Sequence, residues 1–297
     1  MQPLFSRLSA DKVRTYSLVL SAVGVAHRVH RQGPVWSIEV RPDQRGVAVE
    51  AIALYLKENP ARQPDRGQFF PVRGARTYSA LYVAAILSLI HFLIAPGVEQ
   101  GRFVAAFGAD AARIMSGELY RCATALLLHA DIPHLLGNVA GLVLFGTVAA
   151  SLCGWGLGWC MVLAAGFAGN WITAWWYGDN HLSVGSSTAV FGAMGICTVL
   201  SLWNSRRRKN RKVERTWRGW IPLAGGLALL GLLGTAPQAD LMAHLSGFAS
   251  GIVFAGAGVL VFRRLPYGTP AWLEWTAAIV ACAWVAVCWL RGMAWQG

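Results

Sequence analysis

The sequence predicts an all-α polytopic membrane bundle with a small N-terminal α+β soluble domain. Of the 297 residues, 55% are hydrophobic and only 13% are charged, whereas a soluble domain carries about a quarter charged residues. The chain also holds 14 Trp and 33 Gly. Aromatic residues anchor membrane proteins at the interface, and Gly is common in membrane helices. Composition therefore favours a membrane protein over a soluble one.

Residues 1–59 form the predicted soluble domain, because their apolar residues alternate with polar ones and no run is long enough to span a bilayer. The expected elements, in the order α-β-β-α, are a helix over Asp11–Val25, a strand over Ala26–His30, a strand over Trp36–Val40 and a helix capped by Asp43. A linker with several Pro and Gly residues follows at 60–76. This order indicates a compact regulatory or interaction module.

Apolar runs of membrane-spanning length recur from Thr77 onward. Seven spans are predicted, near residues 77–96, 134–152, 156–177, 187–204, 217–234, 241–261 and 271–290. Between the first two, the stretch 101–115 is nearly amphipathic, which suits a segment that lies in the membrane interface.

The net charge is +12, and seven of the 26 basic residues fall in one loop, RRRKNRKVER over 206–215. Basic loops next to apolar spans face the cytoplasm, so this loop predicts a cytoplasmic N-terminus. A lipid-headgroup or phosphate site in the loop is the alternative. The expected surroundings are a lipid bilayer, a bacterial inner membrane, and no nucleic acid.

Six cysteines lie mostly inside apolar segments and show no CxxC spacing. In such surroundings cysteine acts as a small hydrophobe. We therefore expect neither disulfides nor structural zinc.

Four polar residues in the predicted spans converge at one depth. His134 and Asn138 begin the second span, Ser187 begins the fourth, and His244 begins the sixth. Alternate spans start on the same side, so all four are expected at the extracytoplasmic end. Polar groups are costly in a membrane, which makes their convergence a site hypothesis.

The chemistry of these residues fits nucleophilic catalysis. A serine hydroxyl needs a neighbouring base, and a neutral His244 supplies one for Ser187. His134 and Asn138, four apart, share a helix face and can donate to an oxyanion. Asp240 is expected at the membrane surface, so the sequence favours a Ser–His dyad over a triad.

Small residues favour contact between the fourth and sixth spans. Gly247 and Gly251 continue a row begun by Ala243, and Gly192 and Gly195 are candidates to receive it. Such contact would bring His244 to Ser187. Phe191, one turn after Ser187, is expected to support the imidazole by stacking.

Three segments resemble motifs of the rhomboid family. GSSTAVFG (185–192) is similar to the nucleophile motif G-x-S-G-x-x-x-G, HLSGFASG (244–251) to the base motif H-x-x-G-x-x-x-G, and HADIPHLLGN (129–138) to H-x-x-x-x-H-x-x-x-N. The resemblance implies an intramembrane serine protease without metal or cofactor, acting on membrane proteins with a transmembrane segment. It assigns catalysis to Ser187 and His244, the oxyanion site to His134 and Asn138, and supporting positions to Gly185, Phe191 and His129. It also implies a six-helix core over 77–261, followed by a loop and an appended seventh helix in 262–297.

Two positions depart from the family pattern. Thr188 replaces the Gly that usually follows the nucleophile, and a β-branched residue there is expected to narrow the site or alter its preference. Tyr120-Arg121 stands where Trp-Arg is usual in the first outer loop.

Other interpretations stay open. Ser187 and His244 also suit plain packing roles, Ser186 and Thr188 are rival hydroxyls, and His129 either joins the site or braces the outer loop. His181 is expected to be an exposed loop residue. An inactive rhomboid-like protein that binds membrane clients is the main functional alternative. A transporter or channel would require intramembrane acidic residues or a repeat, and neither is evident.

Overall fold

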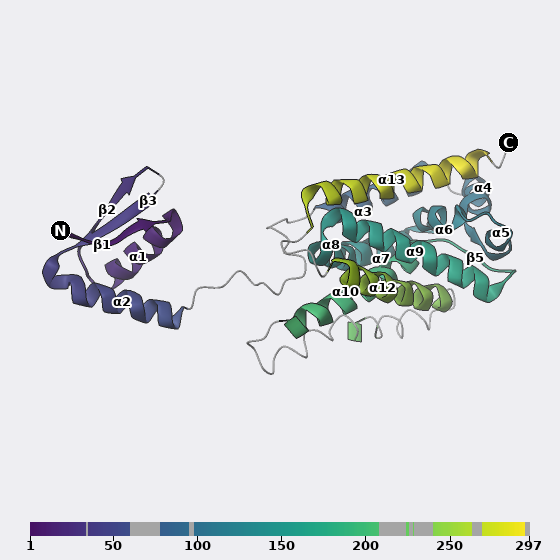
Figure 1. Ribbon diagram of the computed structural model, residues 1–297. Coiled ribbons are helices and arrows are strands. Elements are labelled where there is room, and N and C mark those ends of the chain that lie inside the picture. The colour runs from purple at the N-terminus through teal and green to yellow at the C-terminus, as the bar shows by residue number, and fades with distance from the viewer. Residues whose placement is uncertain are drawn as a thin grey trace. The chain divides into compact units, whose positions relative to one another are not determined.

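The computed structural model describes residues 1–33, 35–59, 78–94, 98–207, 224–225, 228, 240–262 and 269–294. The chain divides into two compact units, Met1–Arg66 and Gly67–Gly297 (Figure 1). Each unit has its own hydrophobic core.

The first unit packs two helices against a three-stranded sheet. Its elements are β1 (Gln2–Leu8), α1 (Ala10–Ala22), β2 (His27–Gln32), β3 (Val35–Val40) and α2 (Arg45–Glu58). The strands are antiparallel in the order β1-β3-β2. Leu20, Ile38 and Ile52 are almost fully buried and join both helices to the central strand. The predicted α+β class of this unit is therefore present, with an additional strand at its start.

Two details of the predicted unit were wrong. Strand β1 was missed because its buried residues, Leu4 and Leu8, are four apart and its register with β3 shifts twice, so no simple alternation marks it. Asp43 does not cap α2. It lies in a 3-10 turn over Pro42–Gln44 and bonds to Arg41 at 2.7 Å, and Gln44 takes the cap position.

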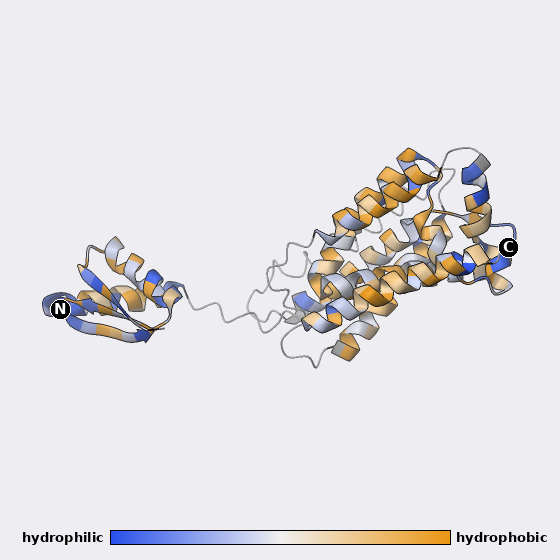
Figure 2. Cartoon of the chain, turned by 90° about the horizontal axis from the view of Figure 1, so that it is seen from above, coloured by the Kyte–Doolittle hydropathy of each residue, from blue (hydrophilic) through white to orange (hydrophobic). Residues whose placement is uncertain are grey.

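The second unit is a helical bundle. Its elements are α3 (Ser79–Leu93), α4 (Val98–Phe107), β4 (Ala109–Asp110), α5 (Ala111–Met115), α6 (Arg121–Thr124), η2 (Ala125–Leu127), α7 (Ile132–Gly141), η3 (Leu142–Gly146), α8 (Thr147–Cys153), α9 (Trp155–Tyr177), β5 (Leu182–Ser183), α10 (Ser187–Arg207), α12 (Leu241–Phe262) and α13 (Ala271–Ala294). Strands β4 and β5 pair antiparallel. Most of the bundle's helical surface is apolar, in contrast to the mixed surface of the first unit (Figure 2).

Five helical stretches within the described residues are long and apolar enough to cross a membrane. They are Ile132–Cys153, Trp155–Tyr177, Ser187–Asn204, Leu241–Val261 and Ala271–Ala294, which match the second, third, fourth, sixth and seventh predicted spans. The first prediction, 77–96, corresponds to the 15-residue helix α3. The predicted span 217–234 lies almost wholly outside the described residues.

Helices α10 and α12 form the centre of the bundle, and glycines let them approach to backbone contact. A Cβ on Gly251 would overlap the carbonyl oxygen of Gly192, and one on Gly195 would overlap that of Phe248. The sequence predicted this small-residue contact, and the structure confirms it. Backbone-to-backbone packing of this kind is the usual way in which membrane helices associate closely.

Helix α13 is fixed to the bundle at both ends. Near its start, the Glu274 carboxylate accepts hydrogen bonds from the backbone N–H groups of Gly156 (2.7 Å) and Leu157 (3.3 Å), at the beginning of α9. Near its end, Trp289 stacks on Phe107 with ring centroids 4.2 Å apart. Helix α4, the first part of the stretch predicted to lie in the interface, is therefore packed against α13.

A methyl group at position 251 should disrupt the α10–α12 contact. We expect Gly251→Ala to reduce the free energy of unfolding by about 1–3 kcal/mol, because the added Cβ overpacks a backbone contact. Gly256→Ala on the same helix is the matched control, since a Cβ there meets no atom within 4 Å. Unfolding of both variants in mixed detergent micelles measures the difference. Equal stability of the two variants would contradict the packing described here.

Removal of the Glu274 carboxylate should loosen α13. Glu274→Ala leaves two backbone donors at the start of α9 without an acceptor, at a cost of about 1–3 kcal/mol. We expect a lower melting temperature in detergent and faster proteolysis between α12 and α13. Glu99→Ala is the control, because the Glu99 carboxylate is exposed and pairs with Arg102 on the surface. Equal melting temperatures for the two variants would show that Glu274 does not hold the helix.

Candidate active site

Three consecutive hydroxyls begin helix α10, and their environments differ. Ser186 is 2% exposed and Thr188 is 1% exposed, whereas Ser187 is partly exposed. Ser186 Oγ also shares a hydrogen bond with His129 Nε2 at 3.3 Å. A substrate can reach a side chain only at the protein surface or in a cavity. Of the three hydroxyls, that of Ser187 is therefore the accessible one, and it is also the one that motif spacing favours as a nucleophile.

Gly185 places the start of α10 against the beginning of α7. Its φ of +119° is strained for residues other than glycine. A Cβ at this position would lie 2.6 Å from His134 Nε2 and 3.2 Å from Asn138 Nδ2. The Gly185 N–H donates to the Ala125 carbonyl at 2.9 Å and so fixes the loop. The segment leading to Ser187 thus lies directly beside both predicted oxyanion residues.

Asp131 caps the N-terminus of helix α7. Its carboxylate accepts a hydrogen bond from the His134 backbone N–H at 2.7 Å, as an N-cap does. Asn138 follows His134 by one turn and is 5% exposed, and its Nδ2 has no hydrogen-bond partner among the described residues. A buried donor without an acceptor costs about 1–3 kcal/mol. Such a donor is suited to a negative oxygen that is present only during a reaction.

His244 lies on α12 against the face of α10 that carries Ser187. It is 6% exposed, and its ring stacks on Phe191 with centroids 4.4 Å apart and planes inclined by 22°. Phe191 is four residues after Ser187 and shares its helix face. The predicted stacking is therefore present, and it holds the imidazole beside the first turn of α10.

The described hydrogen bonds do not include one between Ser187 and His244. His244 Nδ1 also has no partner there. In substrate-free enzymes the bond between nucleophile and base is often long and tightens when substrate binds. The structure thus brings six predicted site residues to one end of the bundle: Ser187, His244, His134, Asn138, Gly185 and Phe191. It does not join Ser187 to His244 by a described hydrogen bond.

Thr188, the departure from the glycine pattern, points away from this group. Its Cγ2 methyl lies where Cβ atoms on Gly169 of α9 and Gly247 of α12 would stand. The side chain therefore fills a space between three helices that two glycines leave open. The expected narrowing of the site by Thr188 is not supported, since its bulk is absorbed in the helix interface.

Comparison with known proteins is consistent with this arrangement. Residues 116–262 match the Rhomboid domain family model, and this segment contains all three motifs. The chain belongs to the rhomboid family. Similar proteins include Rhomboid protease GluP of Bacillus subtilis (strain 168), 28% identical over 69% of this chain and 39% of that protein, and Rhomboid-like protease 1 of Toxoplasma gondii, 26% identical over 62% and 61%. Inactive rhomboid protein 2 of Homo sapiens is 28% identical over 51% and 16%. The chain thus spans less than two thirds of the length of these relatives.

Family membership and the five apolar helices together make the chain an integral, multi-pass membrane protein. Within the described ranges, no three His, Cys, Asp or Glu side chains gather as metal ligands. The groups assembled at this end of the rhomboid domain are a hydroxyl, imidazoles and an amide. These are the components of acyl-transfer chemistry.

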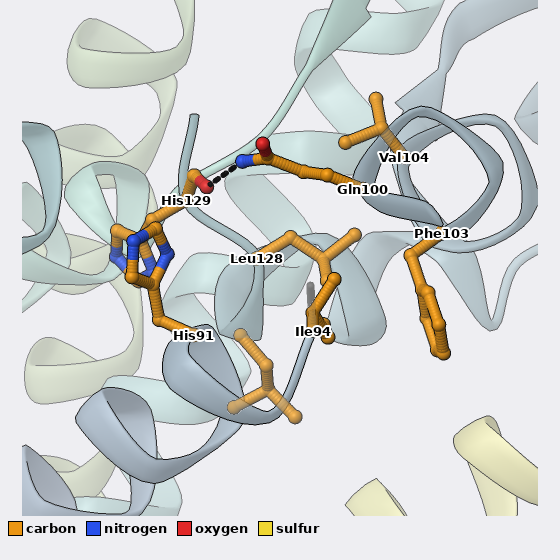
Figure 3. A pocket seen from close by; sticks show the side chains of 8 residues that line it. His91, Ile94, Gln100, Phe103, Val104, Leu128 and His129 are labelled. Carbon is orange, nitrogen blue, oxygen red and sulfur yellow. Dashed lines mark hydrogen bonds between the residues drawn. The ribbon is translucent and has the colours of Figure 1, made fainter. Parts of the chain in front are cut away.

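His129 supports the candidate site through contacts with Ser186 and His134. Besides its bond to Ser186, its ring meets that of His134 edge to face, with centroids 5.4 Å apart. Its carbonyl oxygen accepts a hydrogen bond from Gln100 Nε2 of α4 at 3.0 Å (Figure 3). Burial lowers the pKa of His129 to about 4, with smaller contributions from the other nearby histidines. The imidazole is therefore neutral at neutral pH.

A small pocket lies beside His129. It is lined by His91, Ile94, Gln100, Phe103, Val104, Leu127, Leu128 and His129 (Figure 3). It has room for about one water molecule. Neither Ser187 nor His244 lines it, so it is not the reaction site.

The segment between α4 and α7 is held by a buried ion pair that the sequence analysis did not identify. Arg121, 1% exposed, donates to Glu118 at 2.6 Å and to the carbonyls of Ala105 and Gly108. The Tyr120 hydroxyl donates to the same carboxylate at 3.0 Å. A Glu three residues before an Arg was the available signal. Tyr120-Arg121 therefore serves loop structure rather than contact with Ser187.

One further residue, His181, differs from expectation. His181 is not an exposed loop residue. Its Nε2 bonds to Asp240 at 2.8 Å, with side-chain exposures of 21% and 15%. Burial alone would raise the pKa of Asp240, but hydrogen bonds from His181 and from the Ala243 N–H outweigh burial and lower it. Asp240 is thus a carboxylate engaged with His181 and with the helix start.

Acid should destabilise the domain through His129. Its pKa lies near 4 when folded and near 6.5 when unfolded, so the unfolded chain binds the extra proton between these values. Stability contributed by the neutral ring is complete above pH 6.5 and is lost as the pH falls toward 4. Between pH 7.5 and pH 5 the loss is about 2 kcal/mol.

Unfolding in mixed micelles at the two pH values measures this loss. His129→Gln removes the titrating group, so its stability should fall by about 2 kcal/mol less than that of the wild type over the same interval. Identical pH dependence of the two proteins would contradict the assignment.

Proposed function

We propose that this chain is an intramembrane serine endopeptidase that hydrolyses peptide bonds in or near transmembrane segments of membrane proteins. The observation that carries the proposal is the stacking of His244 on Phe191, one helical turn from the partly exposed Ser187. A nucleophile and a base on facing helices, held by backbone-level packing, are the two groups that nucleophilic catalysis needs. Relatives named as rhomboid proteases support the same reaction class.

The proposed reaction has two halves. Ser187 Oγ attacks the carbonyl carbon of the scissile peptide while His244 accepts the hydroxyl proton. The tetrahedral intermediate collapses, His244 returns the proton to the leaving amine, and an ester on Ser187 remains. Water then attacks the ester with His244 as base, which releases the acid and restores the serine.

The oxyanion of each tetrahedral intermediate is assigned to Asn138 and His134. Asn138 Nδ2 is buried without a partner, and both side chains adjoin Gly185, two residues before the nucleophile. A preorganised donor of this kind contributes about 3–4 kcal/mol to the stability of the transition state.

A dyad rather than a triad is proposed. Asp240, one turn before His244, is engaged by His181 and by the backbone of Ala243. His244 Nδ1 has no acceptor among the described residues. The imidazole orientation is then supported by the Phe191 ring instead of by a carboxylate.

The proposed substrates are membrane proteins whose transmembrane segment can unwind near the outer interface. A helical backbone keeps its carbonyls in hydrogen bonds, so unwinding must precede attack by Ser187. Residues 77–261 would form the protease core and 262–297 the appended helix, in a bacterial inner membrane with a cytoplasmic N-terminus. Residues 1–59, joined by the linker 60–76, would serve as a regulatory or interaction domain.

An inactive, client-binding rhomboid is the second candidate. The observation in its favour is that proteins named inactive rhomboid also match this chain. Such a protein would bind a transmembrane segment and tolerate loss of the hydroxyl at 187. The two functions therefore predict different effects of Ser187→Ala, which removes only the hydroxyl oxygen.

The test is cleavage of a single-span membrane protein by the purified chain in detergent. We expect Ser187→Ala and His244→Ala to reduce turnover by at least about 10³-fold, because each removes a reacting group. Ser250→Ala is the matched control, since Ser250 is a serine of the neighbouring helix α12 that is buried and whose hydroxyl has no described partner. Activity unchanged in folded Ser187→Ala would reject the protease and favour the client-binding protein.

A further inference from the structure

His181 and Asp240 join the two segments that carry the proposed nucleophile and base. His181 precedes Ser187 by six residues, and Asp240 precedes His244 by four. Their side chains meet at 2.8 Å between Nε2 and Oδ2. Neither residue belongs to the three rhomboid motifs, so the motifs do not account for this contact.

The His181 side is a well-anchored segment. The His181 ring stacks on Tyr177, at the end of α9, with centroids 4.0 Å apart and planes inclined by 17°. The His181 carbonyl accepts a hydrogen bond from the Ala111 N–H at 2.8 Å. Strand β5, which follows immediately, pairs with β4 of the outer loop. His181 therefore provides a fixed point from which the chain runs through Gly185 to Ser187.

Asp240 lies at the N-terminal end of α12, and this helix end depends on a fixed contact. Asp240 Oδ1 accepts a hydrogen bond from the Ala243 N–H at 3.0 Å and caps α12, while its Oδ2 faces His181. His244 is the fourth residue of this helix, and its N–H donates to the Asp240 carbonyl at 3.1 Å. The first turn of a helix is the part that frays most readily. The base thus lies in the turn that depends most on its cap.

Glycine contacts restrain α12 on the other side of His244. Gly247 packs on the Thr188 backbone, and Gly251 packs on that of Gly192. Both contacts follow His244 in the helix. The His181–Asp240 pair restrains the turn from the opposite direction, so His244 is held between two attachment points.

We propose that His181 and Asp240 are positioning residues for the Ser187–His244 dyad, a role that rests on the proposed protease function. The pair fixes the first turn of α12 relative to the segment that leads into Ser187. Displacement of reacting groups by about 1 Å can cost up to about 100-fold in rate. Loss of the pair should therefore lower kcat and leave KM nearly unchanged, because substrate binding does not use either side chain.

The experiment compares His181→Ala, His181→Gln, Asp240→Ser and the His181→Ala/Asp240→Ser double variant, with the full chain in detergent. Gln can place its amide N–H near the position of His Nε2 and donate to Asp240. Ser retains an N-cap oxygen but loses the partner of His181. His30→Ala is the matched control, since His30 pairs with Glu39 at 3.3 Å in the first unit. Readouts are kcat and KM for a single-span substrate, and the rate at which a fluorophosphonate probe labels the protein.

The proposal predicts a specific pattern. His181→Ala and Asp240→Ser should each lower kcat and the labelling rate about tenfold, with KM within about twofold of the wild type. His181→Gln should recover most of the loss, and the double variant should be no slower than either single variant, as for one shared interaction. His30→Ala should match the wild type.

Three results would overturn the positioning role. They are wild-type kcat in His181→Ala, equal impairment of His181→Ala and His181→Gln, and a double variant whose loss is the product of the single losses. A Ser187→Ala arm separates this failure from failure of the proposed function. If Ser187→Ala cleaves and labels like the wild type, the protease function itself is rejected and the positioning role with it. If Ser187→Ala is inert while His181→Ala is fully active, only the positioning role is rejected.

Discussion

The arrangement depends on the contact of α10 and α12 at the level of their backbones. A side chain on Gly251 would force the helices apart because it would meet the backbone of Gly192, and one on Gly195 would meet that of Phe248 in the same way. Lipid tails are as apolar as the helix surfaces, so burial of apolar surface alone gives no reason for two helices to associate in a bilayer. Close packing does, and here it also sets the separation between Ser187 and His244. The relative position of Ser187 and His244 therefore depends on glycines, which lack a side chain and so let α10 and α12 approach closely.

Local patterns in the sequence were enough to predict most membrane helices and to single out the polar residues that the fold brings to one end of the bundle. His134, Asn138, Ser187 and His244 are polar exceptions in apolar runs, and such exceptions are visible without a structure. Hydrogen bonds between distant segments were not predicted. The bond from His181 to Asp240 and that from Glu274 to Gly156 join residues that no spacing rule relates. Asp43 was misassigned for a local reason, because Pro42 begins a 3-10 turn and the helix starts one residue later than predicted.

Thr188 illustrates why a motif departure is hard to judge from one segment. In the sequence it is a β-branched residue beside the nucleophile. In the fold its methyl group occupies space left by Gly169 and Gly247, on two other helices. Volume added at one position is matched by volume missing at two others, as close-packed interiors require. Whether Thr188 fits depends on the total side-chain volume that three helices contribute to their shared interface. The sequence alone does not say which helices are neighbours.

The position of Glu274 has a consequence for biosynthesis. A ribosome makes α9 more than a hundred residues before it makes the side chain that receives the amides of Gly156 and Leu157. Until then those donors must be satisfied by water or headgroups at the membrane surface. The start of α9 reaches its final state only when α13 has been synthesised and docked. Assembly of this bundle is therefore completed from its C-terminal end, and a chain truncated before Glu274 would leave the ribosome with its third predicted span unfinished.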